Sequence, residues 1–199
     1  MLELSGVSVA RGGSAVISNL DFNFEPGRCT GIFGANGSGK STLLAALAGD
    51  LPFAGEIRFL GRAYRDLEFG EFRKMRAVLL QDLEINFPIT VREYLEMAKG
   101  EITEAEIDSV LSEVGAADLI EKKITELSKG QLQRIEIAAV IAQDSSILLL
   151  DEPFSAQDAA SVKRLSKLFK ALAKSGKIVI IASHIDGANG TLFTRKLTL

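Results

Sequence analysis

The fold of this chain is decided by the stretch CTGIFGANGSGKST, residues 29–42. Its first five residues are small or apolar, as in a buried strand, and residues 34–41 match the pattern G-x-x-x-x-G-K-[ST]. Such a loop turns successive backbone N–H groups toward an anion, and the helix that follows adds the positive end of its dipole. The stretch therefore predicts a nucleotide phosphate site between a strand and a helix.

We expect every residue of this loop to contact the nucleotide. Lys40 is expected to reach the terminal phosphates and to act in catalysis, while the hydroxyl of Ser41 is expected to bind Mg²⁺. The predicted contacts are Gly34, Ala35, Asn36, Gly37, Ser38, Gly39, Lys40, Ser41 and Thr42.

Two adjacent carboxylates end another apolar strand, residues 147–152. Ligands of parallel sheets bind at the carboxyl ends of strands, so both side chains should face the phosphates. Asp151 is predicted to hold Mg²⁺, and Glu152 to accept a proton from the water that attacks the γ-phosphate. His184 is the only histidine. It follows a third apolar strand and is expected at the same edge, near the γ-phosphate.

A second candidate anion site lies in the segment LSKGQ, residues 127–131. The simpler interpretation is that Ser128 caps a helix that has Gly130 in its first turn. The alternative is an anion site, because a hydroxyl, free amides and a helix dipole converge there. The residues alone leave both interpretations open.

The remaining pattern predicts an α/β core. Runs 77–80, 147–150 and 178–181 show no polar alternation, as expected for strands covered on both faces. We predict strands at 7–10, 20–24, 28–33, 56–60, 77–80, 147–151 and 178–182, and helices at 40–48, 128–143 and 159–174.

Between residues 87 and 126 strand signals vanish, and helices are predicted there instead. The first spans 91–99, the second begins at Thr103 with Glu106 completing a capping box, and the third spans 116–123. The α/β core is therefore expected to carry an all-helical insertion.

Composition narrows the function classes. The chain has 199 residues and a formal net charge of −3 with scattered Lys and Arg, so nucleic acid is not an expected partner. Cys29 is the only cysteine, which excludes an internal disulfide and favours the cytoplasm. No apolar run approaches the ~18 residues of a membrane span, and no secretory signal pattern is present, so direct membrane insertion is not expected.

Taken in order, these motifs resemble the ATP-binding cassette (ABC) ATPases along essentially the whole chain. The motifs are the phosphate loop, Gln81, residues 127–131, the pair at 151–152 and His184. The resemblance implies one ABC ATPase domain over residues 1–199, an α/β fold with a P-loop NTPase core. It also implies an N-terminal antiparallel β region and an inserted α-helical subdomain at about residues 87–127.

The resemblance also implies roles for single residues. Gln81 is expected to be a Mg²⁺ ligand and to sense the attacking water, and His184 to be the switch histidine. Residues 155–158 resemble the D-loop, which places Asp158 at the nucleotide. The signature motif, formed by Ser128, Gly130 and Gln131, is expected to bind the γ-phosphate of ATP held by a second chain, so that activity requires a dimer.

The chain departs from the family pattern in four places. Lys129 replaces a signature glycine, Gln157 replaces a common D-loop leucine, and Ala139 stands where an arginine is frequent. Arg11 aligns with the aromatic residue that stacks on adenine. We expect Arg11 to contact the base, either through a cation–π contact or in a way that leaves the base loosely held.

Residues 76–81 (RAVLLQ) and 87–93 (FPITVRE) resemble the ATPase subunits of bacterial and archaeal importers for haem, iron-siderophore and cobalamin. This implies a transport-coupled ATPase, peripheral on the cytoplasmic face of the membrane, with separate integral-membrane permease subunits. A groove near Phe69, Phe72, Met75 and Phe87 is expected to receive a permease helix. The alternative is that these side chains belong to the core.

Two other functions compete with transport. A soluble ABC protein acting on ribosomes or nucleic acid usually has two cassettes or long coiled coils, whereas this chain has one cassette and no heptads. A P-loop kinase would leave Gln81 and the signature unexplained. Transport therefore fits more of the sequence than either alternative.

Overall fold

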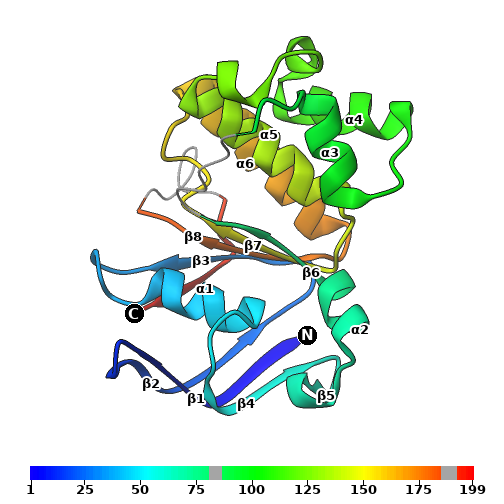
Figure 1. The fold of residues 1–199 in the computed structure, drawn as a ribbon. Coiled ribbons are helices and arrows are strands. Elements are labelled where there is room, and N and C mark those ends of the chain that lie inside the picture. Colours follow the sequence, from blue (N-terminus) through cyan, green and yellow to red (C-terminus); the bar gives the residue numbers. More distant parts are fainter. Residues whose placement is uncertain (81–86, 185–191) are drawn as a thin grey trace.

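One helix lies between two sheets (Figure 1). The computed structural model describes residues 1–80, 87–184 and 192–199. Helix α1, Lys40–Ala48, has a parallel sheet on one side and an antiparallel sheet on the other (Figure 1). The predicted α/β core with an N-terminal antiparallel region is thus confirmed.

The parallel sheet brings the ends of three strands together. Its order is β6-β7-β8-β3-β9, and each neighbouring pair is parallel. Since β7, β8 and β3 run parallel, the segments that follow them leave the sheet at the same edge. Because β8 lies between the other two strands, these three segments are neighbours. The strands are β3 Cys29–Phe33, β6 Arg76–Leu79, β7 Ile147–Asp151, β8 Ile178–Ala182 and β9 Arg195–Thr198.

The antiparallel sheet has the order β2-β1-β4-β5. Its first two strands are longer than the predicted 7–10 and 20–24. In β1, Leu2 and Leu4 are buried, as are Val7 and Val9, but the register shifts between the two pairs. This irregularity interrupts the alternation on which a strand prediction depends. The strands are β1 Leu2–Arg11, β2 Ser14–Phe24, β4 Ala54–Phe59 and β5 Arg62–Ala63.

Helices α5, Lys129–Ala142, and α6, Ala159–Lys174, cover the other face of the parallel sheet (Figure 1). In β7, Leu148 joins the core cluster under α5 and α6, whereas Leu149 joins the cluster around α1. Successive residues of a strand face opposite sides, so a strand covered on both sides must be apolar throughout. This explains the runs without polar alternation.

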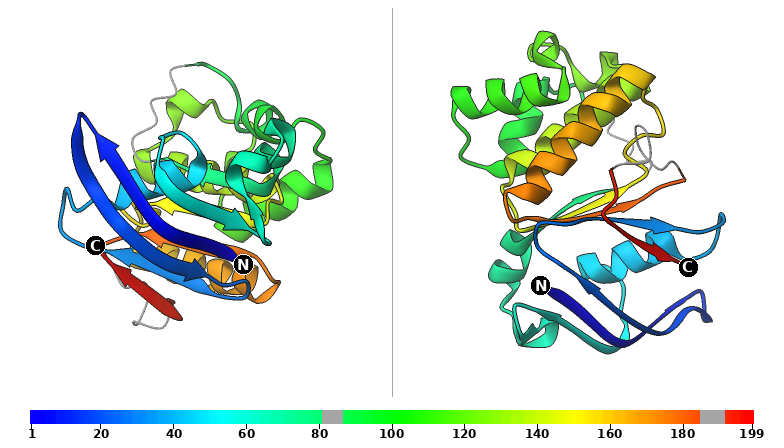
Figure 2. Two further views of the ribbon diagram at one scale, coloured as in Figure 1. Left: turned by 90° about the horizontal axis from the view of Figure 1, so that it is seen from below. Right: turned by 180° about the vertical axis from the view of Figure 1, so that it is seen from behind.

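The inserted helices are α3, Val91–Lys99, and α4, Glu104–Val114. They lie at the end of the molecule away from the antiparallel sheet (Figure 2). The backbone N–H of Glu106 donates to Thr103 Oγ1 at 3.3 Å, which confirms the predicted capping box. Helix α4 packs against α5 and α6, and α3 packs against α5. The insertion therefore rests on the helices that cover the sheet.

The predicted helix over residues 116–123 is wrong. Only one 3-10 turn, η2 at Ala117–Leu119, forms within it. The carbonyls of Ile120 and Lys122 accept hydrogen bonds from the first two N–H groups of α3. These tertiary bonds occupy acceptors that a longer helix would need for its own backbone.

Several short elements were not predicted: β5, β9, η1 Tyr64–Asp66, α2 Phe69–Met75 and η3 Ile124–Glu126. Helix α2 has seven residues, too few to show a clear helical period. Among the described residues, no helix combines the length and the apolar character needed to span a bilayer.

Candidate functional site

The segment after β3 turns tightly into α1. Gly37 and Gly39 have φ angles of 82° and 102°, the left-handed region that favours glycine. At Gly39, an added Cβ would lie 2.7 Å from Val16 Cγ1. Both the backbone angle and the lack of space therefore require glycine at position 39.

The start of α1 has backbone donors that no side chain caps. Its N-cap residue is Gly39, which provides no side-chain cap, and its first turn has no acidic residue. The first N–H groups of a helix have no partner within the helix. Lys40 is buried, and its Nζ donates to the carbonyls of Gly34 at 3.0 Å and Ala35 at 3.2 Å. Free N–H groups at a helix start and a buried ammonium are suited to binding an anion.

A cavity of about 610 Å³ opens over this loop. Its volume falls in the range of small-molecule sites, roughly 300–1,000 Å³. It is lined by Arg11, Val16, Asn36, Gly37, Gly39, Lys40, Ser41, Thr42, Glu152 and His184. The structure thus brings six of the nine predicted loop residues, together with Glu152 and His184, to one cavity. The other three, Gly34, Ala35 and Ser38, are not among the residues that line it.

A second cavity of about 440 Å³ shares Arg11 and Ser41 with the first. Asp151 lines this second cavity, so Ser41 and Asp151 face a common space. The sheet order explains this arrangement, because the end of β7 and the start of α1 meet at one edge. The remaining lining residues are Leu44, Ala45, Asp50, Leu51, Leu79 and Leu80.

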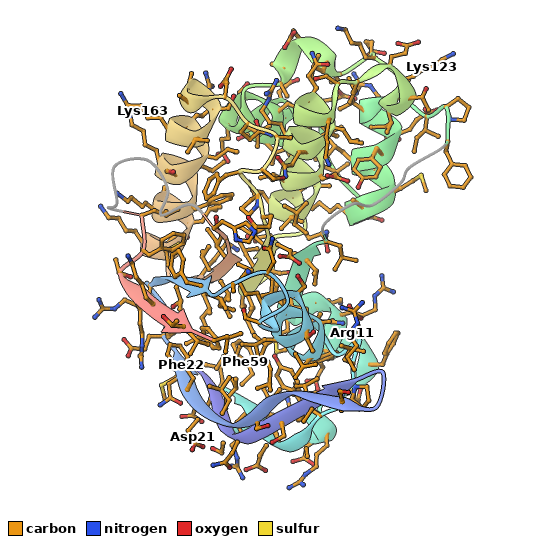
Figure 3. All side chains as sticks on the ribbon, turned by 90° about the vertical axis from the view of Figure 1, so that its left-hand side faces the viewer. Arg11, Asp21, Phe22, Phe59, Lys123 and Lys163 are labelled. Atoms are coloured by element: carbon orange, nitrogen blue, oxygen red, sulfur yellow. The ribbon has the colours of Figure 1, made fainter. Side chains whose placement is uncertain are left out.

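Arg11 is the last residue of β1 and is exposed. Figure 3 shows it near α1, at the hairpin that joins β1 to β2. It lines both cavities, which places a guanidinium within reach of a bound molecule. Its predicted contact with adenine stays a prediction.

Glu152 is held in a strained and buried position. It is 6% exposed, and its φ of 47° is left-handed although it is not glycine. Its Oε1 lies 3.0 Å from His184 Nε2, and its Oε2 accepts from the backbone N–H of His184 at 3.4 Å. Burial raises the pKa of Glu152, and the nearby His184 opposes that rise. The raised pKa and the cavity suit a proton acceptor.

The Ser128 segment begins α5 as a capping box. Ser128 Oγ accepts from the backbone N–H of Gln131 at 3.3 Å, and Gln131 Oε1 accepts from the N–H of Ser128 at 3.0 Å. The predicted N-cap is therefore confirmed. In the described parts of the chain, Ser128, Gly130 and Gln131 line neither cavity. Their predicted contact with a nucleotide would have to involve another molecule.

Asp158 caps α6. Its Oδ1 accepts from the backbone N–H of Ser161 at 2.7 Å, a bond that lowers the pKa of Asp158. Asp158 also lies outside the described lining of both cavities. Gln81 lies outside the described residues, so its role stays a prediction.

Comparison with known proteins decides the family. Residues 17–155 match the model of a protein family described as ABC transporter. The chain belongs to this family. It is 36% identical over 196 residues to the hemin import ATP-binding protein HmuV of Rhodopseudomonas palustris (strain HaA2), an alignment that covers 92% of this chain and 75% of the relative.

Solved structures agree with the fold. A putative ABC transporter ATP-binding protein from Pyrococcus furiosus is 27% identical, with a TM-score of 0.86 over 100% of this chain and 96% of that one. A dimeric bacterial ABC transporter cassette is 24% identical, with a TM-score of 0.86, and covers 100% of this chain and 94% of that one. The chain is thus an ATP-binding and ATP-hydrolysing ABC transporter subunit related to importers, as the sequence predicted.

Two residues of this ABC ATPase site were missed by the sequence analysis. Val16 lines the larger cavity from β2, and Gln133 donates from α5 to the carbonyl of Glu152 at 2.9 Å. Val16 is the third residue of β2, directly after the hairpin turn, so an accurate strand prediction would have pointed to it. Gln133 has no such signal, because a single sequence does not show that α5 contacts the end of β7.

The four side chains predicted to form a groove for a permease helix differ in their burial. Met75 is buried, and Phe72 packs against Tyr64 with ring centroids 4.9 Å apart. For these two side chains the core interpretation is correct. Phe69 and Phe87 are 77% and 68% exposed, so they remain candidates for a partner contact.

Proposed function

We propose that this ABC ATPase powers an importer in which two copies bind ATP between them and act on separate integral-membrane permease subunits. The observation that carries the proposal is the division of the site. Lys40, Glu152 and His184 surround one cavity, whereas the signature residues of the same chain lie elsewhere. In a twofold-symmetric dimer, the signature residues of each copy would reach the cavity of the other copy. The fold relative described as a dimeric cassette supports this arrangement.

In the proposed reaction, Glu152 is the general base. It takes a proton from water as the water oxygen attacks the γ-phosphorus, the bond to the bridging oxygen of the β-phosphate breaks, and ADP leaves. The Lys40 ammonium stabilises the negative charge on the transferred group. His184, 3.0 Å from Glu152, orients the carboxylate and contacts the γ-phosphate.

The residues present fit a Mg²⁺ ion. Ser41 and Asp151 face one cavity with a hydroxyl and a carboxylate, the oxygen donors that Mg²⁺ prefers. Two protein ligands suffice, because Mg²⁺ usually keeps several waters and binds substrate phosphates. Gln81 is the third proposed ligand. When bound, the ion neutralises charge on the phosphate oxygens.

The hemin importer relative suggests the transported class. We propose import of haem, or of an iron-siderophore or cobalamin, chosen by the permease. In this proposal residues 1–199 form one ABC ATPase domain with a helical subdomain at about 87–127. The chain works at the cytoplasmic face of the membrane as a peripheral subunit, without direct contact with nucleic acid.

Cell fractionation tests this proposal against the alternative of a soluble ABC protein that acts on ribosomes. A tagged chain is expected to sediment with membranes and to be released by alkaline carbonate, because it is held by permease subunits rather than by lipid. The measurement is immunoblotting of membrane and ribosome fractions. Sedimentation with ribosomes in sucrose gradients, with none on membranes, would favour the alternative.

The pH dependence of hydrolysis follows from the raised pKa of Glu152. A general base acts only when deprotonated, so hydrolysis is expected to fall as the pH drops through this raised pKa. The acidic limb of the kcat profile should therefore lie above the value of ordinary Glu, about 4.3. Steady-state phosphate release, measured over roughly pH 4 to 8, gives this profile. A limb at the ordinary value would contradict the assignment.

A further inference from the structure

Gln133, on the second turn of α5, uses its whole side-chain amide. Its Nε2 donates to the carbonyl of Glu152 at 2.9 Å and to Ser155 Oγ at 3.1 Å. Its Oε1 accepts from the backbone N–H of Ala156 at 3.3 Å and from Gln157 Nε2 at 2.9 Å. A primary amide has two donor hydrogens and one oxygen with two lone pairs, so every position is occupied. Such saturation is typical of a group that holds one specific arrangement.

The two peptide groups that flank Glu152 are held by different elements. Its N–H donates to the carbonyl of Ala182 in β8 at 2.9 Å, which continues the strand pairing. Its carbonyl accepts from Gln133 and, at 3.1 Å, from the N–H of Ser155. The Ser155 bond is local and moves with the turn, whereas Gln133 belongs to a helix packed on the sheet. Gln133 therefore fixes the carbonyl of Glu152 relative to the rest of the molecule.

The backbone at Glu152 needs such a restraint. A φ of 47° is unfavourable for a residue with a Cβ, and strained conformations persist only where surrounding contacts impose them. The direction of a side chain follows from the two peptide planes at its Cα. Rotation of the carbonyl would thus turn the Glu152 carboxylate away from His184 and the cavity.

Gln157 extends the same restraint to the start of α5. Its Nε2 also donates to the carbonyl of Gly130 at 3.0 Å. An added Cβ on Gly130 would lie 2.5 Å from the carbonyl oxygen of Ala156, so the two segments are in close contact. The segment that follows Glu152 is therefore attached to α5 at several points.

We propose that Gln133 is a positioning residue for ATP hydrolysis: its amide holds the left-handed backbone of Glu152 and thereby aims the Glu152 carboxylate at the attacking water. This inference rests on the proposed role of Glu152 as the general base. Gln133 touches neither the cavity nor, in this proposal, the substrate, and it acts only through Glu152.

The test replaces Gln133 by methionine, which keeps the side-chain length and removes all four hydrogen bonds. The kcat for ATP hydrolysis by the full chain is expected to fall about 10- to 100-fold, because a small misplacement of a reacting group is costly. KM for ATP should stay unchanged, since the phosphate loop is not affected.

Two further variants make the test decisive. Gln133→Glu keeps an acceptor for Ala156 and removes the donor to Glu152, so it should lower kcat even if the methionine variant folds poorly. Gln143→Met, at the exposed end of α5, is the matched control and should leave kcat unchanged. Thermal melting of all variants reports on folding.

Each outcome has a separate meaning when Glu152→Gln is measured in parallel. Loss of hydrolysis in Glu152→Gln with full kcat in both Gln133 variants overturns the positioning role alone. A fall in kcat accompanied by an equal rise in KM and a lower melting temperature shows a structural role, which also overturns it. Hydrolysis retained by Glu152→Gln overturns the proposed base and, with it, this inference.

Discussion

Replacing Glu152 by glutamine is expected to lower ATP hydrolysis at least ~100-fold, the usual contribution of a general base. Glutamine has the same shape and keeps an oxygen that can accept the N–H of His184, but it cannot take the proton from water. ATP binding should survive, because Lys40 and the loop amides are unchanged. With ATP bound and not hydrolysed, two copies should remain associated. Phosphate release, fluorescent-nucleotide binding and sedimentation with and without ATP measure the three effects.

Glu113→Gln is the matched control for this variant, because Glu113 is exposed on α4 and distant in sequence from the cavity residues. It should hydrolyse ATP at the unchanged rate. Undiminished hydrolysis by Glu152→Gln would show that Glu152 is not the general base. Loss of hydrolysis without an ATP-dependent dimer would support Glu152 as the general base. It would contradict the proposal that two copies bind ATP between them.

Replacing Lys40 by methionine is expected to have the second large effect, on binding as well as on turnover. The change keeps the length of the buried side chain but removes the only ammonium that lines the described part of the larger cavity. Hydrolysis should fall about 10²- to 10³-fold, as for loss of a preorganised donor to a developing anion. ATP affinity should weaken in parallel, because the phosphates lose a charge-assisted hydrogen bond. Isothermal titration with ATP and a phosphate-release assay measure the two effects.

Lys163→Met provides the control, since Lys163 is exposed on α6 (Figure 3). It changes the net charge by the same amount without touching the loop. Wild-type affinity in Lys40→Met would show that the amides of the loop and of α1 hold the phosphates without the ammonium. Equal losses in both lysine variants would point to long-range charge rather than to a contact.

Much of the site was predictable because it depends on short, continuous segments. The phosphate loop needs glycines, a lysine and a helix start in one order, and residues 34–42 contain all of these. The N-cap at Ser128 likewise depends on residues that are close in sequence. Apolar runs identified the buried strands, because a strand covered on both faces has no polar side.

Other predictions were wrong or missing because contacts between distant segments determine the local structure. Residues 116–123 have a helical pattern, but the carbonyls of Ile120 and Lys122 bond to α3 instead. Strand β9 and helix α2 are too short to give a clear periodic pattern, and their conformation depends on the segments that pack against them. The prediction that Phe72 faces a permease helix was wrong, because the ring of Tyr64, eight positions earlier in the chain, packs against the ring of Phe72.

The sequence by itself determined the groups that hold phosphate, because their geometry belongs to one uninterrupted backbone segment. Only the tertiary structure decided which distant groups join them. The order β7-β8-β3 brings Glu152 and His184 to Lys40, and the packing of α5 on the sheet brings Gln133 to the carbonyl of Glu152. Strand order and helix packing depend on contacts between residues far apart in the chain, and no local pattern encodes those contacts.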